Sequence, residues 1–179
     1  APAMWLHGAG KQMLEFYTHS DRLSSVFALA DDVSVAPPFS MEYGFSAGNN
    51  QNFYTGLETV YSVNPRLVYL SPSPNADIDD HVLSEFVYKV AEHQLSRQEH
   101  FVFAYPWYSD IWENEWMKAL TNLSSVNYQR VDLSSYSKYR WNKQDGTIYL
   151  IHNLPKNSLI PLEKGPYFQK GKKIPKQLT

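Results

Sequence analysis

The stretch of sequence that decides the fold is residues 66–105, RLVYLSPSPNADIDDHVLSEFVYKVAEHQLSRQEHFVFAY. It opens and closes with short, largely apolar runs, Arg66–Leu70 and Phe101–Tyr105, of the kind that buried strands carry. Between these runs, residues 77–95 place apolar side chains along one stripe of a long helix that Asp77 can cap. A strand, a helix and a second strand in this order predict two parallel strands joined by a helical crossover.

The alternation of strand and helix continues toward the amino terminus. Residues 3–7 are a short apolar run that stops at Gly8-Ala9-Gly10, and Lys11–Tyr17 carries apolar side chains at helical spacing. A further apolar run, Val26–Leu29, ends beside a pair of aspartates. We therefore expect a strand, a tight turn, a helix and another strand in this order.

The remaining segments complete the predicted order of elements. Residues 36–56 are rich in proline, glycine, asparagine and aromatic residues, which predicts a long irregular connection before a short helix over 57–63. Asp110–Leu123 has the apolar spacing of a helix. Residues 128–133 and 147–151 favour strands, and the polar segment between them leaves no room for a helical crossover, so we expect an antiparallel hairpin.

These elements predict an α/β fold with a doubly wound, Rossmann-like sheet that is mainly parallel and ends in a C-terminal antiparallel hairpin. Such sheets bind ligands outside the carboxyl ends of their strands. Residues 1–154 are expected to form this domain. Residues 155–179 carry several lysines among prolines and glycines and are expected to form a basic tail.

Composition limits the possible partners. The 179 residues have a formal net charge of -2, so nucleic acid would need a local basic patch, and no apolar run is long enough to cross a bilayer. We expect a soluble protein without membrane or metal partners. The chain has no cysteine, which fits both a reducing compartment and an exported protein, and the cytoplasm is favoured. The sequence opens at Ala1 without a basic segment or the apolar core of a signal peptide. We therefore expect a processed or excised chain in which Ala1 is not the native start.

A strand and helix series that finishes in an antiparallel hairpin resembles the seven-stranded class I methyltransferases, whose last strand is inserted antiparallel. The resemblance covers roughly residues 3–154 and implies S-adenosylmethionine as the cofactor. His7, Gly8 and Gly10 stand where that family has its glycine-rich first loop, although Met13 occupies the place of a third glycine. Asp31 and Asp32 are also implied in cofactor binding. They stand at the end of the second predicted strand, where that family uses an acidic residue to bind the ribose hydroxyls of the cofactor. The alternative is an ordinary turn and a solvated strand end.

The same resemblance implies a catalytic segment after the strand over 66–70. Amino-methylating members carry Asp, Asn or Ser there, followed by two prolines and an aromatic residue that stacks on the base. Here Ser71 and Pro72 match, while Ser73 and Pro74 replace the second proline and the aromatic residue. The resemblance therefore assigns the reacting end to Ser71, Pro72, Ser73 and Asn75, and the alternative is a proline-stiffened loop.

Aromatic residues after the strand over 101–105 are candidates for substrate binding. Tyr105, Trp107 and Tyr108 could stack on a base, although aromatic clusters more often pack in a core. Phe101–Trp107, together with the helix and hairpin that follow it, is similar in layout to the cap-adenosine methyltransferases. Glu113 and Glu115 form an E-x-E pair such as ADP-ribosyltransferases use, but in the first turn of a helix glutamate simply suits the helix dipole.

The sequence thus favours an S-adenosylmethionine-dependent methyltransferase-like domain that acts on a nucleic acid or nucleotide. Two alternatives remain open. One is a catalytically inactive relative that binds another protein, and the other is a module that binds a dinucleotide or a sugar nucleotide.

Overall fold

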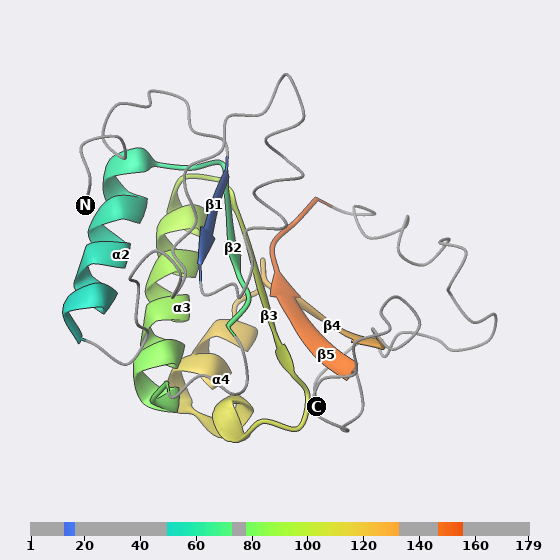
Figure 1. Ribbon diagram of the computed structural model, residues 1–179. Helices are drawn as coiled ribbons and strands as arrows, with labels where there is room; N and C mark the ends of the chain where they lie inside the picture. The colour runs from blue at the N-terminus through green and yellow to red at the C-terminus, as the bar shows by residue number, and fades with distance from the viewer. Residues whose placement is uncertain (1–12, 17–49, 73–77, 133–146, 156–179) are drawn as a thin grey trace.

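The computed structural model describes residues 13–16, 50–72, 78–132 and 147–155, which form a mixed sheet with helices packed against it (Figure 1). The elements in chain order are β1 (Met13–Phe16), α2 (Asn50–Val63), β2 (Leu67–Leu70), α3 (Asp80–Ser96), β3 (His100–Pro106), the 3₁₀ helix η3 (Asp110–Glu113), α4 (Glu115–Thr121), β4 (Asn127–Asp132) and β5 (Thr147–His152). The α/β class predicted from the sequence is confirmed.

Within the described residues, the sheet has five strands in the order β1-β2-β3-β5-β4. β1, β2 and β3 are parallel, with Phe16 beside Leu70 and Leu70 beside Phe103. β5 is antiparallel to both of its neighbours, β3 and β4. β4 therefore runs in the same direction as β1, β2 and β3. The predicted hairpin of the last two strands is confirmed, and its second strand lies inside the sheet rather than at its edge.

The crossover from β2 to β3 forms as the sequence predicts, with α3 beginning three residues later than expected. The N-cap is Asp79, whose side chain accepts a hydrogen bond from the Val82 N–H at 3.0 Å. The buried stripe of α3 repeats every three or four residues and comprises Leu83, Ser84, Phe86, Val87, Val90, Ala91 and Gln94. The Gln94 Nε2 donates to the Pro65 and His100 carbonyl oxygens, both at 2.9 Å, so the end of α3 is fastened beside the beginnings of β2 and β3.

α2 is longer than the sequence suggested. The helix begins at Asn50, so the end of the irregular connection predicted over 36–56 is helical. Its buried side is formed by Phe53, Leu57 and Val60, and a glycine, Gly56, lies among them. A Cβ at this glycine would come within about 3 Å of two buried phenylalanine rings, so the missing side chain allows α2 to pack closely.

The helix predicted over Lys11–Tyr17 is wrong, because Met13–Phe16 is a strand. All four residues of β1 are at most 1% exposed. β1 is buried on both faces and carries three apolar residues, Met13, Leu14 and Phe16, and over four residues their spacing cannot be distinguished from one side of a helix. The helix that was expected to follow the turn at Gly8-Ala9-Gly10 is therefore absent over Met13–Phe16.

The helix predicted over Asp110–Leu123 is split at Asn114. Asn114 has an extended backbone, and its side-chain oxygen accepts a hydrogen bond from the Trp116 N–H at 3.0 Å. Asparagine favours this capping position because its side chain competes with the helical backbone for hydrogen bonds. The result is a 3₁₀ turn followed by the short helix α4.

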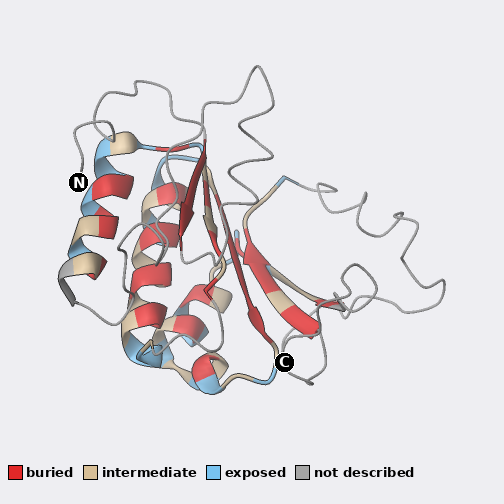
Figure 2. Ribbon diagram, in the orientation of Figure 1, coloured by how far each residue is buried: buried red, intermediate tan, exposed pale blue. Residues whose placement is uncertain are grey.

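The two faces of the sheet are covered differently (Figure 2). The helices in the described part of the chain pack on one face, in a single core that also takes in η3 and side chains from β1, β2, β3 and β5. The smaller apolar cluster on the other face includes Val102, Ala104, Val131, Ile148 and Leu150, and none of the described helices contributes to it. We name these the helix face and the second face. The doubly wound arrangement, with helices on both faces, stays a prediction.

Several predicted features lie outside the described residues. These are the expected strands over 3–7 and 26–29 and the basic tail beyond Pro155. No helix in the described ranges is long and apolar enough to cross a membrane.

Candidate functional site

The candidate site lies where β1, β2 and β3 end together, at the lower edge of the sheet in Figure 1. The Ser71 N–H donates to the Phe16 carbonyl oxygen at 3.1 Å, so the residue after β2 is fixed beside the end of β1. The first turn of α3 and the 3₁₀ helix η3 border the same edge. We call this region the carboxyl edge, and parallel sheets bind ligands at such an edge.

Two of the four predicted catalytic residues are described, and both lie at the carboxyl edge. Ser71 is half-buried and Pro72 is buried, while Ser73 and Asn75 lie outside the described residues. The Ser71 side chain forms a hydrogen bond with Tyr69 on the second face. Burial raises the pKa of Tyr69, the bond to Ser71 opposes this increase, and the charge of Glu15 adds to it. The Ser71 hydroxyl is therefore already engaged within the protein.

The predicted substrate-binding residues fall into two groups. Tyr105 is 6% exposed, and its ring stacks on Phe103 with the centroids 5.7 Å apart. Burial raises the pKa of Tyr105 to about 12, and the charge of Asp80 contributes to the increase. Tyr105 is thus part of the core on the helix face. Trp107 is half-buried and Tyr108 is exposed, and both residues follow β3 at the carboxyl edge.

The predicted cofactor-binding residues cannot be placed. His7, Gly8, Gly10, Asp31 and Asp32 all lie outside the described residues. The change of Met13–Phe16 from predicted helix to strand removes part of the reasoning for the glycine loop, since that loop was expected to connect a strand to a helix. Their role in binding a cofactor stays a prediction.

Charged residues at the carboxyl edge were not predicted as site residues. Asp79 and Asp80 begin α3, and Asp110 begins η3. The pKa of Asp80 is raised, first by burial and then by the charges of Asp79 and Asp110. The sequence does carry a signal, because acidic residues crowd the first turn of the long helix, but the helix dipole alone is enough to account for acidic residues at that position.

A basic residue approaches the same edge from β4. The Arg130 guanidinium lies over the Trp107 ring, 4.3 Å from its centroid. The Trp107 N–H donates to the Thr147 carbonyl oxygen at 3.3 Å, which ties the segment after β3 to the beginning of β5. No local pattern in the sequence could have joined Arg130 to Trp107, because their contact depends on the order of the strands.

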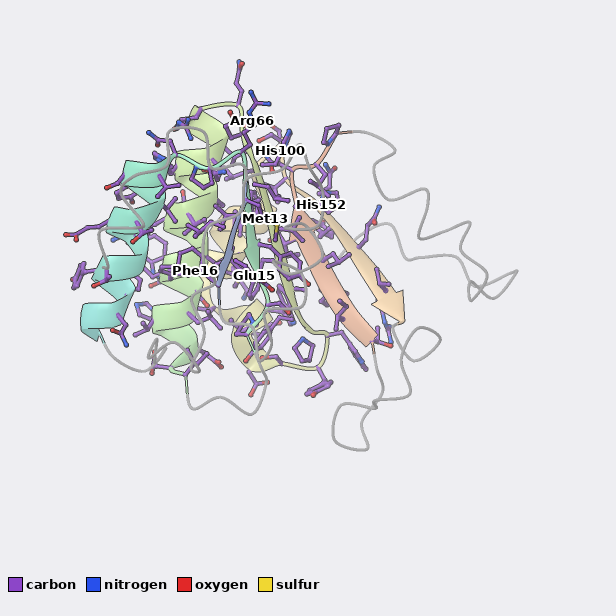
Figure 3. All side chains as sticks on the ribbon, turned by 45° about the horizontal axis from the view of Figure 1, so that its top comes forward. Met13, Glu15, Phe16, Arg66, His100 and His152 are labelled. Carbon is purple, nitrogen blue, oxygen red and sulfur yellow. The ribbon has the colours of Figure 1, made fainter. Side chains whose placement is uncertain are left out.

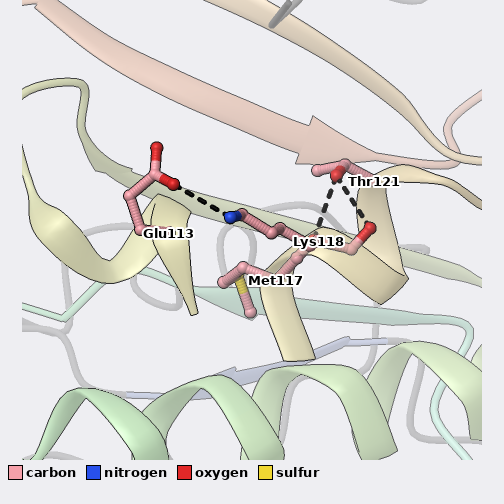
Figure 4. A network of polar contacts seen from close by, with 4 residues as sticks. All are labelled: Glu113, Met117, Lys118 and Thr121. Carbon is pink, nitrogen blue, oxygen red and sulfur yellow. Dashed lines mark hydrogen bonds and ion pairs between the residues drawn. The ribbon is translucent and has the colours of Figure 1, made fainter. Parts of the chain in front are cut away.

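The E-x-E pair has a structural explanation. Glu113 forms an exposed ion pair with Lys118 at 2.9 Å, as Figure 4 shows together with the hydrogen bonds of Thr121. Glu115 is the first residue of α4, where a carboxylate suits the helix dipole. The arrangement gives no support to an ADP-ribosyltransferase site.

A second set of polar residues lies at the opposite, amino-terminal edge, where Figure 3 labels Arg66, His100 and His152. His152 is 5% exposed, and its Nδ1 accepts a hydrogen bond from the Leu154 N–H at 3.1 Å. The proton of the neutral ring is then on Nε2, and no described group pairs with that nitrogen. Burial lowers the pKa of His152, so the ring is held neutral.

The described residues include no group of three or more His, Cys, Asp or Glu side chains placed to hold a metal ion. Comparison of the chain with protein-family models, with curated proteins and with solved structures gave no match in any of the three.

Proposed function

We propose that this chain is an S-adenosylmethionine-dependent methyltransferase-like domain that binds its cofactor at the carboxyl edge. The observation that carries the proposal is the position of β5. The last strand of the described residues is inserted between β3 and β4 and is antiparallel to both. An inserted antiparallel last strand is the feature on which the resemblance to class I methyltransferases depends.

The insertion is informative because simpler arrangements exist. Strands that follow each other in sequence usually lie side by side. Here β4 follows β3 in the sequence but does not pair with it, and β5 lies between the two. The β2-α3-β3 crossover and the parallel direction of β4 complete a sheet that is parallel except for its inserted strand. Fold alone does not determine function, so the chemistry has to be argued from the site.

The methyl acceptor we propose is an amine of a nucleic acid or nucleotide. Ser71 and the backbone after it would accept hydrogen bonds from the amine, and Ser73 and Asn75 would complete the reacting end. Tyr108, which is exposed, and the half-buried Trp107 would bind the base, because both follow β3 at the same edge. The resemblance assigns the cofactor to His7, Gly8, Gly10, Asp31 and Asp32, although Gly8 and Gly10 precede β1 in the chain and do not follow it as the family's glycine-rich loop does.

Two observations favour a second candidate, a methyltransferase relative that has lost catalysis and binds a partner protein. The Ser71 side chain already bonds to Tyr69, and Pro74 stands where the family stacks an aromatic ring. A domain of this kind would retain the sheet and lose the transfer of the methyl group. A dinucleotide or sugar-nucleotide module remains a third alternative.

A ligand screen distinguishes these candidates. We expect S-adenosylmethionine and S-adenosylhomocysteine to raise the melting temperature, whereas NAD and sugar nucleotides do not. A ligand at a hundred times its Kd adds about 2.7 kcal/mol to the free energy of unfolding. Stabilisation by NAD alone would favour the third alternative, and no stabilisation by any of these ligands would favour the partner-binding domain.

Transfer of a labelled methyl group to RNA then tests catalysis. Ser71→Ala should slow the transfer by about two- to tenfold, the effect of losing one hydrogen bond between neutral groups, and leave the cofactor affinity unchanged. Tyr69→Phe is the matched control, because it removes the existing partner of Ser71 but keeps the serine. Cofactor binding without any methyl transfer would identify an inactive relative.

A further inference from the structure

Two buried polar atoms on the second face have no hydrogen-bond partner in the described part of the chain. One is the Nε2 of His152 on β5, and the other is the Oε1 of Gln129 on β4. His152 is 5% exposed, and Gln129 is half-buried. A buried polar atom without a partner costs free energy, so two such atoms on one face indicate a group that binds to both.

The two side chains are diagonal neighbours on this face. In the sheet register, Asn127 is the partner of His152, and Gln129, two residues further along β4, is the partner of Leu150. The Cα atoms of diagonal neighbours are about 7–8 Å apart, a distance that long side chains can span. One small group between them can therefore contact both the imidazole and the amide.

The hydrogen-bonding role of each atom is defined. The His152 Nδ1 accepts a hydrogen bond from the Leu154 N–H at 3.1 Å, so the proton of the neutral ring is on Nε2, which is a donor. Burial lowers the pKa of His152, which keeps the ring neutral. The Gln129 Oε1 is an acceptor. The bound group must therefore accept one hydrogen bond and donate another.

The surroundings favour an amide over a water molecule. Buried apolar side chains flank the pair, because Val102 is the partner of His152 and Leu150 is the partner of Gln129. A buried water usually makes about three hydrogen bonds, whereas a planar amide can make two and pack its faces on apolar side chains. A trans peptide group points its N–H and C=O to opposite sides. A lactam or a primary carboxamide has them side by side, as this pair requires.

We propose that His152 and Gln129 form the polar end of a second-face site for a small free molecule with a planar amide, either the lactam of a nucleobase or a primary carboxamide. The imidazole Nε2 donates to the ligand carbonyl oxygen, and the ligand N–H donates to the Gln129 Oε1. Because His152 is 5% exposed, the site admits the free molecule and excludes a nucleotide that carries it.

The site is separate from the carboxyl edge. His152 lies beside Val102, near the beginning of β3 and toward the amino-terminal edge, where Figure 3 labels it. Ser71 follows β2 at the opposite edge. The inference therefore goes beyond the proposed function and does not depend on binding of S-adenosylmethionine.

The test measures the melting temperature of the full chain with free uracil and with nicotinamide. At least one of them should raise it, with a concentration dependence that gives the Kd. 1,3-Dimethyluracil and N,N-dimethylnicotinamide keep the carbonyl groups but lack the N–H, so they should give no shift. A shift with uracil alone identifies a lactam site, and one with nicotinamide alone a carboxamide site. No shift with either compound, or equal shifts with their methylated forms, would overturn the proposal.

Variants of the pair locate the site. Gln129→Leu should weaken binding about two- to tenfold, the effect of losing one hydrogen bond between neutral groups. His152→Asn should weaken it similarly, because asparagine can still accept from the Leu154 N–H but is too short to place a donor where Nε2 lies. Asn127→Leu is the matched control, since it removes an amide from an exposed position of the same strand and should leave the affinity unchanged. Equal losses in Asn127→Leu and Gln129→Leu would contradict the assignment.

The stability of the free protein gives a second readout. Without ligand, Gln129→Leu should raise the free energy of unfolding, because it removes a buried oxygen that has no partner among the described residues. The increase should exceed that of Asn127→Leu, which brings the same gain in strand propensity at an exposed position. A decrease in Gln129→Leu would mean that a water molecule already satisfies the oxygen, and the amide site would then be rejected.

Discussion

The two faces of the sheet are buried to a similar extent but are built from different residues. Along β3, Phe101, Phe103 and Tyr105 point to the helix face, and Val102 and Ala104 point to the second face. All five are at most 8% exposed. On β3, the large aromatic side chains therefore lie under the helices, and the smaller Val102 and Ala104 side chains lie on the second face.

The second face also carries buried polar groups. Glu15, Tyr69, Val102 and His152 are successive partners across β1, β2, β3 and β5, and they form one row that contains a carboxyl, a phenol and an imidazole. Burying such groups costs free energy unless hydrogen bonds replace the lost water. The comparison indicates that the helix face supplies most of the apolar stabilisation, whereas the second face depends on satisfying polar groups.

The largest expected difference between the faces follows from two truncations on one strand. Phe103→Ala should lower the free energy of unfolding by about 3–5 kcal/mol, because it removes a fully buried ring and leaves a cavity. Val102→Ala, one residue earlier on the opposite face, should cost about 2 kcal/mol, since only two methyl groups are lost. Denaturant unfolding of both variants measures the difference. Equal losses would show that the second face stabilises the sheet as strongly as the helix face.

The sequence predicted an element of the fold correctly where its pattern of apolar residues was long enough to repeat. The β2-α3-β3 unit was predicted within a few residues because seventeen helical residues repeat their buried stripe several times. β1 offers four residues, each buried, and has no repeat from which to identify its period. The β4-β5 hairpin was predicted from the short connection, but its insertion beside β3 depends on packing between distant strands, which no local pattern records.

The candidate site shows the same limit. Ser71 and Trp107 could be placed at one edge because both follow predicted parallel strands. The burial of Tyr105 and the contact between Arg130 and Trp107 could not, since each depends on which strand lies beside β3. An aromatic residue at the end of a strand looks the same in sequence whether its ring faces the core or the solvent.

A smaller effect is expected at the glycine of α2. Gly56→Val should lower the free energy of unfolding by about 1–3 kcal/mol, because its Cβ would lie 3.0 Å from the Phe86 ring and 3.1 Å from the Phe16 ring, and both rings are fully buried. Glu58→Val is the matched control, since it introduces the same branched side chain at an exposed position of the helix. Denaturation midpoints should fall clearly only for Gly56→Val. A similar small change in both variants would mean that the rings can move aside.

The smallest expected effect tests the polar second face through pH. The pKa of His152 in the folded protein lies below its ordinary value of 6.5, because burial disfavours the charged ring. Below about pH 6.5 the unfolded chain therefore binds the proton first, and the free energy of unfolding decreases as the pH falls toward the folded pKa. Well above pH 6.5 the ring is neutral in both states and adds no pH dependence. His152→Asn removes this titration and offers an amide oxygen to the Leu154 N–H. Unfolding midpoints at about pH 7.5 and about pH 5 should differ less for the variant than for the parent. An equal decrease of the free energy of unfolding in both proteins would mean that the folded protein binds a proton at His152 as readily as the unfolded chain does. The second face would then be no less favourable for a charged ring than the protein surface.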